Sequence, residues 1–109
     1  MNMKNTRIGH NRPKSIKILG KTYAVSWQTP PREQGEPDYL GRCYNDTNHI
    51  YVEPKMPQDQ ILDTLLHEIT HAVSAQLSLD LDEPTVHRLA TGLAAVILDN
   101  PGLFHGSKR

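Results

Sequence analysis

The sequence predicts an α+β fold: a small, mainly antiparallel sheet of three to four strands, followed by two packed helices. Three observations lead to this fold class. Short runs in which β-branched and aromatic residues alternate with polar ones end near residue 53. Proline, glycine and asparagine separate these runs. From residue 61 onward, apolar residues recur at the i, i+3, i+4 spacing of amphipathic helices.

A chain of 109 residues is long enough for one domain with a modest core. We place that domain at residues 15–100, after a basic, flexible arm at 1–14 and before a short tail at 101–109. Lys plus Arg and Asp plus Glu each number 12, so the overall charge favours no highly charged partner. The basic arm could contact nucleic acid or a protein partner, but a solvated arm is the favoured interpretation.

The single cysteine, Cys43, excludes an intramolecular disulfide and indicates a reducing compartment. The first residues lack the apolar segment of a secretory signal. No apolar run approaches the ~20 residues of a membrane-spanning helix. We therefore expect a cytoplasmic protein that makes no membrane contact.

Two hairpins are expected to form the sheet. Residues 16–19 and 21–27 are the first pair of strands, with the reversal at Gly20-Lys21. A loop with three prolines follows at residues 28–38, because proline removes backbone donors from a ladder. Residues 39–44 and 49–53 then flank a tetrapeptide rich in turn formers, and this hairpin is the expected free edge of the sheet.

The first predicted helix starts close to Pro57, where a missing N–H costs little. The second begins near residue 82, with Asp82 as its N-cap and Pro84 in its first turn, and it ends at Asp99-Asn100-Pro101-Gly102. The apolar stripe of the first helix consists of Ile61, Leu62, Leu65, Leu66, Ile69, Ala72, Val73 and Leu77.

The pentapeptide His67-Glu68-Ile69-Thr70-His71 has the H-E-x-x-H pattern and lies within the first predicted helix. Residues i and i+4 lie on the same helical face, so both imidazoles can bind one metal ion. Glu68 lies beside them, where a carboxylate can take a proton from a metal-bound water. The pattern therefore predicts a Zn²⁺ site with His67 and His71 as ligands and Glu68 as the catalytic residue.

A catalytic zinc ion needs a third protein ligand, and the second helix offers His87 and Glu83. In a regular helical hairpin that turns near Asp80, the residue level with His71 is near Leu89. His87 is then within one turn of the metal, whereas Glu83 is about 9 Å short at 1.5 Å per residue. We prefer His87 and keep Glu83 as the reserve, since an irregular connection would reverse the order. Tyr44, His49, Tyr51 and His105 are unranked candidates for a second hydrogen-bond donor.

The segment Leu65-Leu66-His67-Glu68-Ile69-Thr70-His71-Ala72-Val73 resembles the active-site helix of the zincin metallopeptidases. It is most similar to small phage-encoded and bacterial members and to the SprT-like and ImmA/IrrE-like families. The resemblance covers about residues 60–100 and implies a minimal zincin-like core. Residues 83–90 also loosely match the pattern around the glutamate ligand of the ImmA/IrrE-like group, which favours Glu83 over His87.

These observations predict a zinc-dependent metallopeptidase, a hydrolase that cuts peptide bonds of a peptide or protein substrate through a metal-activated water. An extended peptide substrate could pair with the free edge of the sheet. The alternative is a non-catalytic zinc-containing binding or regulatory module that uses the basic arm to contact nucleic acid or a protein partner.

Overall fold

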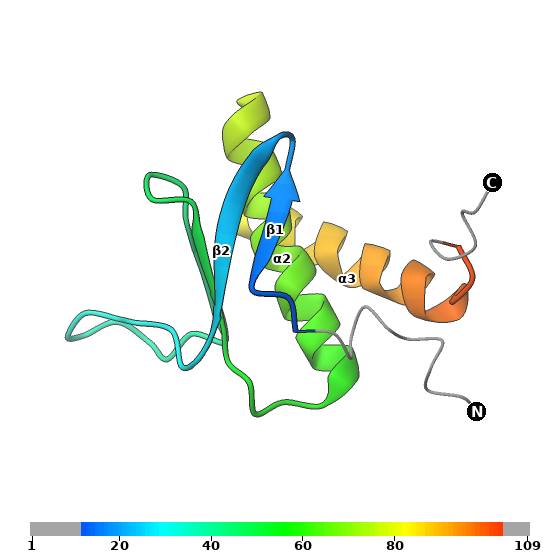
Figure 1. The fold of residues 1–109 in the computed structure, drawn as a ribbon, viewed down its shortest axis with the longest axis horizontal. Helices are drawn as coiled ribbons and strands as arrows, with labels where there is room; N and C mark the ends of the chain where they lie inside the picture. Colours follow the sequence, from blue (N-terminus) through cyan, green and yellow to red (C-terminus); the bar gives the residue numbers. More distant parts are fainter. Residues whose placement is uncertain (1–11, 104–109) are drawn as a thin grey trace.

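The computed structural model describes residues 12–103, which form four strands followed by two helices (Figure 1). This arrangement confirms the predicted α+β class. Most of the predicted basic arm (1–14) and of the tail (101–109) lies outside the described residues. The elements in chain order are β1 (Ser15–Ile18), β2 (Lys21–Trp27), β3 (Gly41–Tyr44), β4 (His49–Val52), α2 (Gln58–Leu77) and α3 (Glu83–Asp99).

The four strands form one sheet in the order β1-β2-β4-β3. The β1–β2 and β3–β4 pairs are antiparallel hairpins, as predicted, but β2 and β4 pair in parallel. The loop at residues 28–40 carries the chain past the position of β4, so β3 lies at the outer edge. Only β3 of the second hairpin is therefore a free edge, and β4 is an inner strand.

The first hairpin reverses at Leu19-Gly20, one residue earlier than predicted. Leu19 has φ 51° and Gly20 has φ 86°, and Ile18 pairs directly with Lys21. A two-residue loop of this kind needs positive φ at both positions, which is the type I′ geometry that matches strand twist. Gly20 supplies one such position without steric cost.

The main core lies between one face of the sheet and α2. Burial alternates along β4, where Ile50 and Val52 are fully buried, because successive strand residues point to opposite faces. On its other side α2 packs against α3. The buried residues of the main cluster are Ile18, Tyr23, Val25, Ile50, Val52, Leu65 and Ala72. The buried apolar residues of α3 are Val86, Ala90 and Ala94.

The connection between the helices folds back along the end of α2. Ser78 ends α2 with φ 55°, and the Leu79 N–H donates to the Ser74 carbonyl (2.9 Å). The Leu81 N–H then donates to the Ser74 hydroxyl (3.1 Å), so residue 81 lies level with residue 74. The predicted N-cap of α3 is confirmed, since the Asp82 carboxylate accepts from the Thr85 N–H (3.0 Å). As a result, α3 begins beside the middle of α2 (Figure 1).

Candidate metal centre

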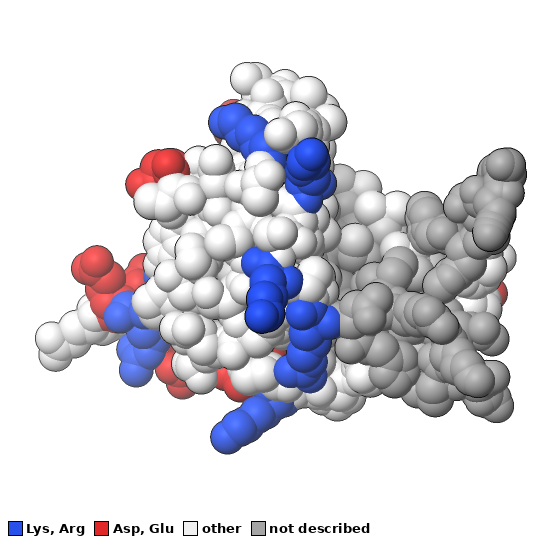
Figure 2. Space-filling model, in the orientation of Figure 1, with Lys and Arg blue, Asp and Glu red and all other residues white. Residues whose placement is uncertain are grey.

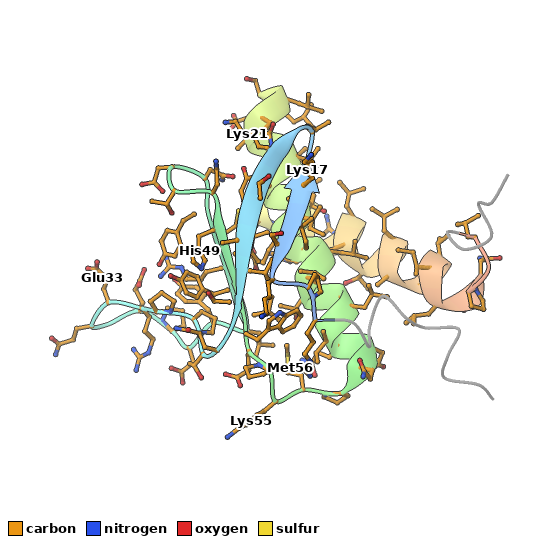
Figure 3. The ribbon with its side chains drawn as sticks, in the orientation of Figure 1. Lys17, Lys21, Glu33, His49, Lys55 and Met56 are labelled. Atoms are coloured by element: carbon orange, nitrogen blue, oxygen red, sulfur yellow. The ribbon has the colours of Figure 1, made fainter. Side chains whose placement is uncertain are left out.

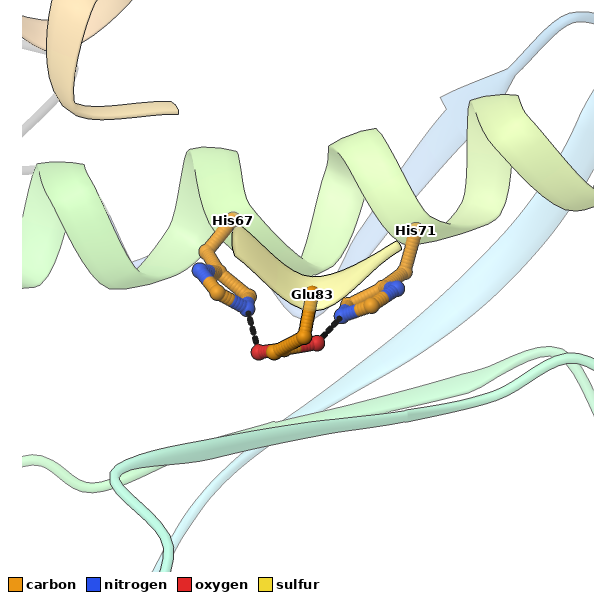
Figure 4. A group of neighbouring side chains, drawn as sticks. All are labelled: His67, His71 and Glu83. Carbon is orange, nitrogen blue, oxygen red and sulfur yellow. Dashed lines mark hydrogen bonds and ion pairs between the residues drawn. The ribbon is translucent and has the colours of Figure 1, made fainter. Parts of the chain in front are cut away.

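Three side chains from the two helices converge at one point (Figure 4). His67 and His71 lie one turn apart on the same face of α2. Glu83, the first residue of α3, places its carboxylate between them. Its Oε2 lies 2.7 Å from His67 Nε2, and its Oε1 lies 2.9 Å from His71 Nε2.

The donor set fits a zinc ion. Within the described part of the chain, these three residues are a group whose ligand atoms all lie within 4.8 Å of one another. Tetrahedral zinc with bonds of ~2.1 Å separates its ligands by roughly 3.4 Å, so small side-chain movements would admit the ion. Two imidazoles and one carboxylate are also a donor set found in catalytic zinc sites, where the fourth position stays open to water.

The structure brings Glu83, the reserve candidate, to the two histidines in place of His87. His87 is exposed on α3, and its ring centroid is 6.2 Å from that of His67. It lines the same cavity but is not part of the three-residue group. The reason is the connection at residues 78–82, whose hydrogen bonds to Ser74 draw α3 back by more than a helical turn. In the regular helical hairpin that we predicted, the connection does not fold back along α2 in this way.

Glu68 is buried beside the three potential ligands, with 5% of its surface exposed. Burial raises the pKa of its carboxyl to about 8, and the negative charge of Glu83 adds to this effect. Arg42 acts in the opposite direction and lowers the pKa. A divalent cation held by the neighbouring ligands would also favour the ionised carboxylate. The acid–base state of Glu68 therefore depends on the charge that the site holds.

The candidate centre opens into a cavity of about 590 Å³. One wall is β3 with the residues before it, and the other wall is formed by α2 and the start of α3. At Gly41 the two walls come close together. A Cβ atom there would lie 2.7 Å from Thr64 Cγ2 and 2.8 Å from Glu68 Oε2. The edge strand thus runs directly beside the predicted catalytic carboxylate.

Arg42 is a site residue that the sequence did not reveal. It lines the cavity and forms an ion pair with Glu36 (3.1 Å). Its guanidinium also lies over the rings of Tyr39 and Tyr44, at 4.3 Å and 5.1 Å from their centroids. No sequence pattern distinguishes this arginine from other charged residues of a strand, because its partners come from the preceding loop.

Among the described residues, the unranked candidates for a second donor do not line the cavity. Tyr44, His49 and Tyr51 lie on strands β3 and β4 and are absent from the cavity lining. His105 lies outside the described residues. Within the described chain, His87 is the remaining imidazole that faces the cavity together with the three-residue group.

Comparisons with protein-family models, curated proteins and solved structures find no match to the chain. Among residues 12–103, neither helix combines the length and the apolar character that crossing a bilayer requires. The functional interpretation therefore rests on the motif and on the geometry of the site.

Proposed function

We propose that the protein is a zinc-dependent metallopeptidase. His67, His71 and Glu83 would hold the zinc ion, and Glu68 would be the general base. The observation that carries this proposal is the convergence of Glu83 from α3 on both histidines of the H-E-x-x-H helix, at 2.7 and 2.9 Å. It completes a three-ligand set and leaves Glu68 beside it without a ligand role.

When bound, zinc would supply Lewis acidity toward the attacking water and the scissile carbonyl. Glu68 would accept the proton of that water and deliver it to the departing amine. Burial raises the pKa of this carboxyl and a bound cation would lower it, so the two effects together would set how readily Glu68 takes up and releases a proton. The substrate would lie in the cavity between β3 and α2, extended along the free β3 edge, whose outer backbone groups can pair with a peptide.

The test combines metal analysis with cleavage of an unfolded protein substrate such as casein. Wild-type protein, purified without a histidine tag, should contain about one equivalent of zinc and cleave the substrate. Glu68→Gln should keep the zinc and lose cleavage by at least a hundredfold, since it removes the base but no ligand. Cleavage that survives Glu68→Gln would refute the peptidase mechanism. Full zinc with no cleavage by the wild type would instead favour the non-catalytic module.

The third ligand is tested by a matched pair of substitutions on α3. Glu83→Gln should weaken zinc binding strongly, because a neutral amide is a poor zinc ligand. His87→Gln should leave zinc content unchanged, since His87 is outside the ligand group. The opposite result, loss of zinc only in His87→Gln, would show that α3 shifts when the metal binds and that His87 is the ligand.

A further inference from the structure

The sheet face that points away from α2 carries a cluster of aromatic side chains, which we call the outer sheet face. On β4, Ile50 and Val52 are buried against α2, so His49 and Tyr51 project to the opposite side. On β3, Cys43 packs against the core, so Tyr44 projects outward with them. Within residues 12–103, both helices lie on the other side of the sheet (Figure 1).

These side chains form an ordered platform. The rings of His49 and Tyr51 are stacked with centroids 4.3 Å apart, and Tyr44 meets Tyr51 edge-on at 5.8 Å. The Ser26 hydroxyl on β2 fixes the His49 ring through a hydrogen bond to Nε2 (2.8 Å). The three rings are half-buried, so each keeps accessible surface. An aromatic cluster held in this way loses little conformational entropy when another flat ring packs on it.

A strip of basic residues runs along the β1 edge of the same sheet. Arg12, Lys14 and Lys17, which lie before and on β1, are all exposed, and none forms an ion pair with another described residue. Residues 12–32 contain no acidic side chain. In Figure 3, Lys17 lies near the β1–β2 turn, and His49 lies across β2 from it. Figure 2 shows basic side chains along this part of the molecule, while acidic ones gather at the left of the view.

We propose that the outer sheet face binds single-stranded nucleic acid, with phosphates along the basic strip and bases packed on Tyr44, His49 and Tyr51. Strands β1 and β4 are separated by β2, which places the strip and the platform about 10 Å apart at ~4.8 Å per strand. Cationic tracks beside aromatic rings are the features that bind single strands without sequence preference. An acidic peptide would use the strip alone, since it offers no flat rings to the platform. This proposal does not depend on the metal centre.

The direct test is fluorescence anisotropy of a labelled 15-nucleotide oligo-dT with the full chain at several salt concentrations. Single-strand binding should weaken with salt at a log–log slope of about −0.7 for each phosphate contact. Lys14→Gln combined with Lys17→Gln should therefore make that slope shallower by about 1.4. Arg88→Gln is the control. It removes an exposed charge on α3, which is away from this face, and should leave the slope unchanged.

The platform is tested by Tyr51→Leu and, as a second variant, Tyr44→Leu, which keep apolar bulk but remove the ring. Either change should weaken oligo-dT binding by about 5- to 150-fold, which is the effect of losing one base–aromatic stack worth about 1–3 kcal/mol. Circular dichroism of each variant checks that the fold persists. The proposal is overturned if the full chain does not bind oligo-dT at low salt. It is also overturned if both ring variants bind like the wild type, or if poly-glutamate competes as well as unlabelled oligo-dT.

Discussion

Replacing Gly41 with alanine should test whether the close approach of β3 to α2 builds the candidate site. The added Cβ would lie 2.7 Å from Thr64 Cγ2, 2.8 Å from Glu68 Oε2 and 3.0 Å from Glu68 Cγ. Ordinary contacts between carbon atoms are about 3.5–4.0 Å, so the methyl group overlaps both side chains by several tenths of an ångström or more. Thr64 is β-branched and has few alternative rotamers in a helix. Either β3 moves away from α2 or the Glu68 carboxylate is displaced.

Overpacking of this kind costs about 1–3 kcal/mol of folding free energy. The chain offers a matched control in Gly92, which lies inside α3 and is exposed, and a Cβ added there would meet no neighbouring atom within 4 Å. Gly92→Ala should stabilise the protein by about 0.5–1 kcal/mol, because alanine is favoured in helix interiors. Glycine-to-alanine substitution is thus expected to destabilise the protein at position 41 and to stabilise it at position 92.

Urea unfolding followed by the fluorescence of Trp27, the single tryptophan, measures both effects. Zinc content and casein cleavage, measured on the folded Gly41→Ala protein, show whether Glu68 has moved. We expect zinc to be retained and cleavage to fall, since the carboxylate is displaced but the ligands are not. A Gly41→Ala protein as stable as the wild type would contradict the close approach of β3 to α2.

Three further predictions concern Glu68, Cys43 and Asp82. Burial raises the pKa of Glu68 to about 8, so in chelator-treated protein its protonated form contributes stability below pH 4.5 that is lost as the pH rises toward 8. Glu68→Gln should therefore gain a few kcal/mol relative to wild type between pH 4.5 and 8.5 in urea unfolding, and a difference that stays constant over this range would contradict the prediction. Burial raises the pKa of the Cys43 thiol to about 12, so at pH 8 a thiol reagent should label the native protein roughly a thousandfold more slowly than the urea-unfolded protein; equal rates would contradict this. Asp82→Ala removes the cap of the Thr85 N–H and should lower the free energy of unfolding in urea by ~1 kcal/mol. It should also weaken zinc binding, because the cap fixes the turn that carries the proposed third ligand. Unchanged zinc affinity would argue against that coupling.

The helices and hairpins were predictable because their signals are local. Both helices follow from apolar periodicity, and the start of α3 follows from Asp82 as an N-cap before Pro84. Each hairpin has turn-forming residues between alternating strands, and the error at the first was one residue. The parallel pairing of β2 with β4 was missed, since it depends on the course of the loop at residues 28–40. No residue pattern in that loop specifies on which side of β4 the next strand lies.

The positions of the two histidines could also be predicted from a local signal. A spacing of four residues on a helix places both side chains on one face, whatever the rest of the chain does. The third ligand is different, because it depends on where α3 lies along α2. That position is set by one polar side chain, Ser74, whose hydroxyl accepts from the Leu81 N–H, and by positive φ at Ser78 and Asp80. Neither Ser78 nor Asp80 is a glycine, so the residue types there are no strong sign of a left-handed turn. Helix geometry argues against Glu83 as a ligand only if the connection between the helices is regular. The connection in the structure is not regular, because it returns along α2 before α3 begins. Which α3 residue lies nearest the two histidines is thus a property of a five-residue connection rather than of the helix that carries it.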